Sequence, residues 1–85
     1  MYQTYILHCA DDTLYVGSTS DLEKRLHQHN NLKSGAHYTK IRRPVTLAYS
    51  EQSATYSEAR KKEAEWKRLT RVQKLGMMEN NKKIK

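Results

Sequence analysis

Apolar and polar positions divide the chain into three strand-like and three helix-like segments. Residues 2–9 and 14–17 are rich in Tyr, Thr, Ile, Leu and Val and flank a polar turn at 10–13, which predicts a β-hairpin. Residues 45–50 alternate and include β-branched side chains, so they predict a third strand. The intervening residues 31–44 end at the only proline and are expected to form a loop or short turn.

Three segments begin with a capping box, in which a Ser or Thr hydroxyl and a Glu or Gln three residues later bond each other's backbone N–H groups. These boxes lie at residues 20–23, 55–58 and 70–73, and they predict helices that end near residues 30, 69 and 78. The element order is then ββα–β–αα, an α+β domain with a small three-stranded sheet flanked by helices.

A length of 85 residues is enough for one domain, which we predict at residues 1–79, followed by a polar basic tail at 80–85. No apolar run approaches the ~20 residues that span a bilayer, and the N-terminus does not resemble a signal peptide. The single cysteine, Cys9, excludes an internal disulfide. We therefore expect a cytoplasmic protein that does not bind membranes.

The net charge of +7 is concentrated in the last third of the chain. Residues 57–85 carry ten basic and four acidic groups, a net of +6, whereas residues 1–56 carry six and five, a net of +1. This asymmetry indicates a polyanionic partner, most commonly a nucleic acid, although a basic face that serves only solubility gives the same pattern.

One carboxylate interrupts the apolar stripe of the second predicted helix. The inward positions are Ala59, 63, Trp66 and 70, and position 63 is Glu63. A glutamate on such a face needs a cation, which is either a nearby Lys or Arg or a functional ligand.

The first predicted helix carries Arg25 and His29 four residues apart, beside its apolar stripe. Both side chains can reach the same edge, where a guanidinium binds a phosphate bidentately and an imidazole transfers protons near neutral pH. Surface Arg and His are also common without any function.

Tyr5 and Tyr15 lie on the two hairpin strands, where tyrosines are ordinarily structural. The few scattered histidines and Cys9 predict no zinc site.

These residues also resemble the GIY-YIG nuclease superfamily, in particular its small stand-alone prokaryotic members. The likeness extends to about Met78 and is carried by residues 5–9, 14–19, 21–25, 29–30, 33–39, 42–45 and 57–59, with Glu63. The family fold, a three-stranded sheet with helices, agrees with the predicted order. The first motif retains only its tyrosine, and a lysine that follows the second motif in excision-repair relatives is Ser18 here. Those relatives also have a late asparagine, which Asn80 or Asn81 would have to supply.

The resemblance implies a site made of Tyr5, Tyr15, Arg25, His29 and Glu63. The resemblance also implies a metal-dependent endonuclease that hydrolyses DNA phosphodiesters, with a role in DNA repair like that of the excision-repair relatives. Glu63 would bind Mg²⁺, or alternatively Mn²⁺, and Gly17 would keep the pocket free of a side chain. Arg25 would bind a phosphate oxygen. A free phenol has a pKa of about 10, so a tyrosine base must be perturbed. We favour Tyr15, assisted by His29, as the base and Tyr5 as the residue that orients the water.

This arrangement makes a prediction about the hairpin. Tyr5 and Tyr15 share a face only if the loop has an odd number of residues or contains a bulge, so we expect a loop of three or five residues around Asp11 and Asp12.

Two other functions stay open: a catalytically inactive nucleic-acid-binding module of the same fold, and a protein-interaction domain. Because no element resembles a recognition helix, we expect selectivity for DNA structure or strandedness rather than sequence, with a larger targeting protein as a possible partner. The expected backbone contacts are Lys61, Lys62, Lys67, Arg68, Arg71 and Lys74.

Overall fold

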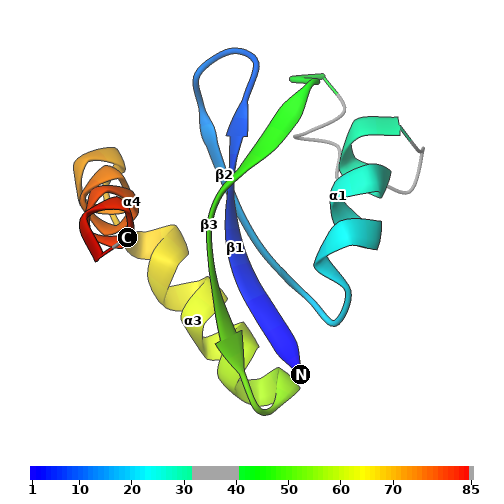
Figure 1. The fold of residues 1–85 in the computed structure, drawn as a ribbon, viewed down its shortest axis with the longest axis vertical. Coiled ribbons are helices and arrows are strands. Elements are labelled where there is room, and N and C mark those ends of the chain that lie inside the picture. The colour runs from blue at the N-terminus through cyan, green and yellow to red at the C-terminus, as the bar shows by residue number, and fades with distance from the viewer. Residues whose placement is uncertain (32–40, 85) are drawn as a thin grey trace.

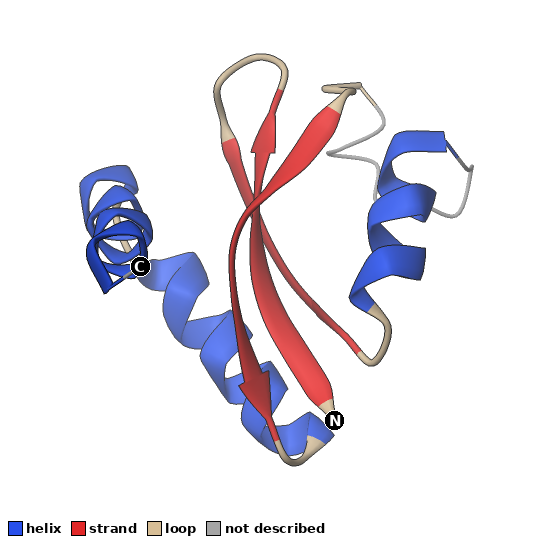
Figure 2. Ribbon diagram, viewed as in Figure 1, coloured by secondary structure: helices blue, strands red, loops and turns tan. Residues whose placement is uncertain are grey.

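The computed structural model describes residues 1–31 and 41–84, in which a three-stranded antiparallel sheet stands between helices (Figure 1 and Figure 2). The spatial order of the strands is β2-β1-β3. β1 is central because four consecutive residues, from Thr4 to Leu7, are buried and fit a strand enclosed on both faces. The strands are β1 (Tyr2–Cys9), β2 (Leu14–Thr19) and β3 (Val45–Ser53).

Helices cover both faces of this sheet. Figure 1 shows α1 (Leu22–Asn31) on one side and α3 (Tyr56–Arg68) with α4 (Arg71–Ile84) on the other. The predicted α+β class and the order ββα–β–αα are confirmed. The predicted end of the last helix near Met78 is wrong, since α4 continues to Ile84. Residues 71–84 contain no proline, and a single glycine does not end a helix.

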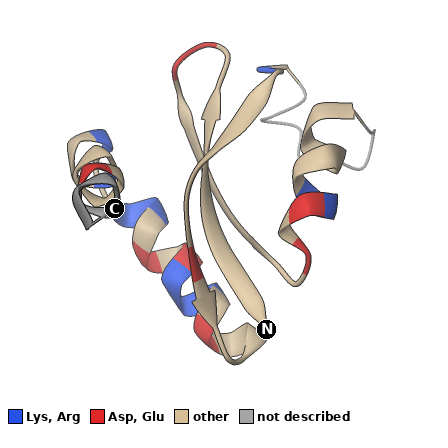
Figure 3. Cartoon of the chain, viewed as in Figure 1, with Lys and Arg blue, Asp and Glu red and all other residues tan. Residues whose placement is uncertain are grey.

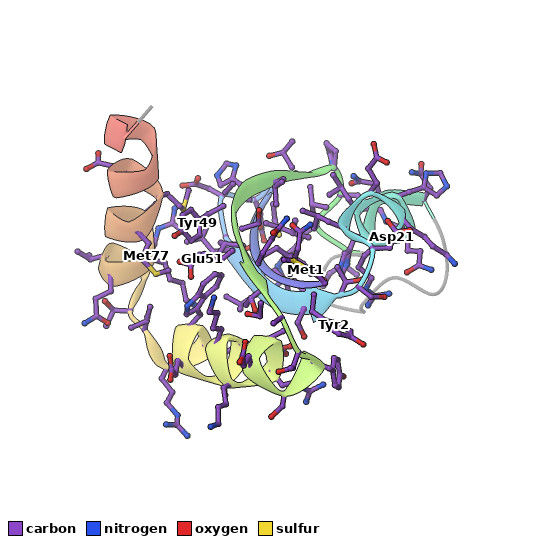
Figure 4. The ribbon with its side chains drawn as sticks, turned by 60° about the horizontal axis from the view of Figure 1, so that its bottom comes forward. Met1, Tyr2, Asp21, Tyr49, Glu51 and Met77 are labelled. Carbon is purple, nitrogen blue, oxygen red and sulfur yellow. The ribbon has the colours of Figure 1, made fainter. Side chains whose placement is uncertain are left out.

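The two faces of the sheet have separate cores. Facing α1, the buried residues are Tyr5, Leu7, Cys9 and Val45, joined by the partly buried Tyr15, Leu22 and Leu26. Between the sheet and the helices α3 and α4, the buried residues are Ile6 and Val16 of the sheet and Trp66 of α3. Their partly buried neighbours include Tyr49 of β3 and Met77 of α4. Figure 4 shows Tyr49 and Met77 between β3 and α4, with Asp21 at the start of α1 on the opposite side.

The hairpin between β1 and β2 has the predicted odd-numbered loop. The backbone N–H of Cys9 donates to the carbonyl of Thr13 at 2.9 Å, which leaves three residues, 10–12, in the loop. Asp12 has a φ of 68°, the left-handed conformation that such a loop requires. In this register Tyr5 lies opposite Gly17 and Leu7 opposite Tyr15, so the two tyrosines share the face that α1 covers.

Two of the three predicted cap residues, Thr55 and Thr70, begin their helices, but only the box at 70–73 is complete, because the Glu58 carboxylate accepts from the N–H of Ala54 instead of Thr55. Thr55 accepts a hydrogen bond from the backbone N–H of Glu58, and Thr70 and Gln73 bond each other's backbone N–H groups at 3.2 and 2.9 Å. The box predicted at Ser20 is wrong. Asp21 caps α1 instead, by accepting from the N–H of Lys24 at 3.1 Å, because a turn closed by Thr19 delays the helix by one residue.

The predicted loop at 31–44 lies mostly outside the described residues. The same holds for residues 33–39, which carried part of the family resemblance.

Candidate active site

The ring of Tyr5 lies across β2 at Gly17, its partner in the hairpin register. A Cβ atom on Gly17 would lie 2.5 Å from the Tyr5 hydroxyl oxygen and 2.7 Å from the ring carbon that bears it. Because Tyr5 is only 1% exposed, its ring has little room to withdraw. This contact explains why position 17 needs a glycine: the Tyr5 hydroxyl lies over the edge strand β2, in the space that a side chain would occupy.

His29 of α1 is completely buried and contacts both tyrosines. Its Nε2 atom lies within hydrogen-bonding distance of the Tyr5 hydroxyl, at 2.9 Å, and the Tyr15 ring meets the imidazole edge-on with centroids 5.3 Å apart. Burial, together with the charges of Arg25 and Arg43, lowers the pKa of His29 to about 4. The imidazole is therefore neutral at pH 7 and keeps one ring nitrogen as an acceptor.

Tyr5 is held in its protonated form. Burial raises the pKa of Tyr5 to about 12, although a hydrogen bond with the Arg25 side chain acts in the opposite direction. Tyr15 is the more exposed of the two phenols. The prediction paired Tyr15 with His29, and the ring contact brings these two side chains together, while the Nε2 atom of His29 bonds Tyr5.

Arg25 brings a positive charge to these tyrosines. It lies one helical turn before His29, and its guanidinium contacts the Tyr5 side chain while Nη1 donates to the Gln28 amide oxygen at 2.9 Å. The predicted convergence of Arg25 and His29 on one edge of α1 is therefore confirmed, with Tyr5 as their common partner.

Two residues to which the sequence assigned no role hold α1 against the sheet. Asn30 bonds both backbone groups of Val45, at 3.0 and 2.7 Å. Arg43 Nε donates to the carbonyl of His29 at 2.6 Å. Arg43 bonds a carbonyl of the last turn of α1, as cations near a helix C-terminus commonly do, but Asn30 bonds a strand 15 residues away, which no local signal in the sequence predicts.

Glu63 lies on the other face of the same edge strand. Its Oε1 accepts from the Ser18 hydroxyl at 2.6 Å and its Oε2 accepts from the Lys67 ammonium at 2.7 Å. Burial would raise the pKa of Glu63, but these two hydrogen bonds and the neighbouring cations lower it below its ordinary value. The cation that a glutamate on this face was predicted to need is thus present, and it is Lys67.

The residues that the resemblance assigns to one site lie on two sides of β2. Tyr5, Tyr15 and Arg25 gather with His29 on the α1 face, whereas Glu63 stands across β2, next to Ser18. Consecutive residues of a strand point to opposite faces, which is why Gly17 borders one group and Ser18 the other. The charge of Glu63 still raises the pKa of Tyr5, so the groups interact around the strand.

Comparison with known proteins decides the family. A model described as the GIY-YIG catalytic domain matches residues 1–76. A UPF0213 protein of Syntrophus aciditrophicus is 48% identical over 91% of this chain and 88% of its own length, and one of Staphylococcus epidermidis is 53% identical over 88% and 90%. Among solved structures, a protein of E. faecalis matches with 42% identity and a TM-score of 0.63, covering 93% of this chain and 83% of its own. A UPF0213 protein of Bacillus halodurans matches with 34% identity and a TM-score of 0.59, covering 93% and 84%.

This chain belongs to the GIY-YIG family. Its relatives among the UPF0213 proteins are small and stand-alone, as the resemblance predicted. The GIY-YIG family generally comprises endonucleases.

Two departures from the GIY-YIG motifs have structural explanations. Thr4, in the first motif, donates its hydroxyl to the carbonyl of Ala59 at 2.9 Å and so joins β1 to α3. Ser18, which replaces the lysine of excision-repair relatives, bonds Glu63. From the sequence, Ser18 was interpreted only as the loss of that lysine, and its role as a partner of Glu63 was missed.

Within residues 1–31 and 41–84 of this GIY-YIG domain, no three His, Cys, Asp or Glu side chains are grouped so that they could hold a metal ion. Across the same residues, no helix is long and apolar enough to cross a membrane.

The six basic residues predicted to contact nucleic acid divide into two groups. Three have acidic partners within the domain: Lys62 with Glu51, Lys67 with Glu63, and Arg71 with Asp12. Lys61 and Arg68 are exposed on α3, and Lys74 is half-buried on α4. Figure 3 shows the resulting mixture of basic and acidic residues along α3.

Proposed function

We propose that this protein is an endonuclease that hydrolyses phosphodiester bonds of DNA with a divalent cation, Mg²⁺ or Mn²⁺. The observation that carries the proposal is the buried Tyr5–His29 pair beside the Arg25 guanidinium, with the ionised Glu63 on the other side of the same edge strand. Membership of a family that generally comprises endonucleases supports the same conclusion.

Arg25 is the proposed phosphate-binding group. Its guanidinium is half-buried and already fixed by Gln28, so little conformational freedom is lost when it bonds an oxygen of the scissile phosphate. A fixed cation at this position stabilises the extra negative charge of the transition state more than the charge of the substrate.

The two phenols have different proposed roles. Tyr5, with its pKa of about 12 and its bond to neutral His29, keeps its proton and orients the attacking water as a hydrogen-bonding group. Tyr15 is more exposed, and it would act as the base in its phenolate form, after its own proton has passed to solvent, by taking the proton of that water. His29 bonds Tyr5 and meets the Tyr15 ring edge-on, so it is the proposed assistant of both phenols.

Glu63 is the proposed metal ligand. The residues present fit a hard cation, because Glu63 is ionised and already holds a cation, the ammonium of Lys67. One protein carboxylate is sufficient for Mg²⁺, which keeps several waters and binds substrate oxygens. When bound, the metal neutralises phosphate charge and stabilises the departing oxygen.

Contacts to the phosphate backbone are proposed for Lys61, Arg68 and Lys74, and for Lys67 once it leaves Glu63. Such contacts favour structure- or strand-selective cleavage over sequence recognition. They also predict a steep loss of affinity with added salt, which a protein-interaction domain would not show toward DNA.

A panel of labelled DNA and RNA substrates, including flaps, branches, single strands and duplexes, tests the proposal in the presence of Mg²⁺, Mn²⁺ or EDTA. Cleavage is expected with a metal and not with EDTA. Arg25→Ala and Glu63→Gln should each reduce cleavage by about 1000-fold or more while leaving the circular dichroism spectrum unchanged. Lys24→Ala removes the adjacent, exposed charge on α1 and should cleave nearly as well as the natural chain.

The second candidate is a binding module without activity, and the engagement of both Glu63 oxygens by Ser18 and Lys67 favours it. This module would bind DNA in a salt-dependent manner but leave every substrate of the panel intact with either metal. Equal cleavage by the natural chain, Arg25→Ala and Glu63→Gln would contradict the proposed endonuclease site.

A further inference from the structure

The two oxygens of Glu63 have partners of different character. Oε1 bonds the hydroxyl of Ser18, which is fixed to the sheet by the β1–β2 pairing, whereas Oε2 bonds the ammonium of Lys67. The Glu63 side chain is 13% exposed and that of Lys67 is 54% exposed. One oxygen is therefore held by the sheet and the other by a flexible cation at the protein surface.

The contact between Glu63 and Lys67 is easily exchanged. It is an i,i+4 pair on α3, with the glutamate nearer the N-terminus, and such pairs contribute little because the lysine remains largely in water. A divalent cation carries twice the charge of the ammonium and binds carboxylate oxygen directly. Both cations cannot occupy the same oxygen, since like charges at that distance repel each other.

We propose that Lys67 occupies the metal's place at Glu63 in the metal-free protein and that a divalent cation must displace it. This inference rests on the proposed function, in which Glu63 is the metal ligand. Ser18 keeps the carboxylate oriented during the exchange through the oxygen that Lys67 does not use. The displaced ammonium then lies beside the metal site on the surface of α3, where it is available to a phosphate of the nucleic acid, so metal loading and substrate binding are coupled through one lysine.

Binding of Mn²⁺ to the full chain in the absence of nucleic acid tests this exchange without any measurement of cleavage. Free Mn²⁺ is quantified by electron paramagnetic resonance during a titration. Lys67→Gln is expected to bind Mn²⁺ about three- to tenfold more tightly than the natural chain, because the competing cation is gone. Glu63→Gln is expected to bind at least about tenfold more weakly.

Lys61→Gln is the matched control. It removes the same charge from an exposed position of the same helix, but two residues from Glu63, so the side chains do not face each other. Its Mn²⁺ affinity should stay within about twofold of the natural chain.

The outcomes separate the two proposals. If Glu63→Gln weakens Mn²⁺ binding while Lys67→Gln leaves it unchanged or weaker, the exchange is wrong and Glu63 remains the metal ligand. If Glu63→Gln binds Mn²⁺ as well as the natural chain, the metal site of the proposed function fails, and the exchange fails with it. If Lys67→Gln and Lys61→Gln raise the Mn²⁺ affinity equally, the effect comes from general surface charge, and the proposed exchange is wrong.

Discussion

On one face of β1, Ile6 packs against Val16 and Trp66, and on the other, Tyr5 packs against His29 and Gly17. Both faces are fully enclosed, since Ile6 is 0% and Tyr5 is 1% exposed. The core of the α3 face is built from apolar side chains, whose burial stabilises the domain. The α1 face buries a phenol and an imidazole, which is favourable only while each bonds the other. The same strand thus packs Ile6 into the core under α3 and places the Tyr5–His29 pair under α1.

The largest effect is expected on the apolar face. Trp66 is 5% exposed and packs against Ile6, Val16 and the ring of Tyr49, so Trp66→Ala should lower the free energy of unfolding by about 3–5 kcal/mol. Leu26→Ala, on the α1 face, removes a partly buried side chain and should have a smaller effect, about 1–2 kcal/mol. Urea denaturation followed by circular dichroism measures both. A larger loss for Leu26→Ala would mean that the α1 face carries the stability.

This division between faces also explains how much the sequence could predict. The strands and two of the helix starts follow from local rules, because Thr55 and Thr70 act only on neighbouring backbone groups. The shared face of Tyr5 and Tyr15 followed from strand parity. The positions of Glu63 and Ser18 did not, because they depend on how α3 packs across β2, which no local pattern encodes.

The residues of the α1 face were predicted as a set through the family resemblance, but not their pairing. The hydrogen bond of His29 to Tyr5 and its ring contact with Tyr15 depend on where α1 lies, and Asn30 and Arg43 hold α1 there through long-range bonds to backbone groups. Single-residue patterns carry no information about such bonds until the loop before β3 is placed.

The next largest effect is a pH dependence that belongs to the α1 face. The pKa of His29 falls from 6.5 to about 4 on folding because the ring is buried near Arg25 and Arg43. Below pH 6.5 the unfolded chain takes up a proton that the folded chain refuses, so stability should decrease as pH falls, by about 2 kcal/mol between about pH 7.5 and about pH 5.

Urea denaturation at the two pH values checks this dependence. His29→Gln, which has no titrating ring, should lose that part of the dependence, whereas His27→Gln, at an exposed position of the same helix, should retain it. Identical pH profiles for the natural chain and His29→Gln would mean that folding leaves the pKa of the imidazole unchanged.

Two glycines that would receive the same methyl group have different surroundings. In Gly17→Ala the new Cβ would overlap the Tyr5 hydroxyl, so the buried ring must shift, at a cost of about 1–3 kcal/mol in unfolding free energy. In Gly76→Ala the Cβ meets nothing within 4 Å, and the better helix propensity of alanine should stabilise α4 by about 0.5–1 kcal/mol. Thermal unfolding of the two variants should therefore shift in opposite directions. A Gly17→Ala variant as stable as the natural chain would show that Tyr5 can leave its place over β2 freely, and the polar face would then be an adaptable lining rather than a fixed site.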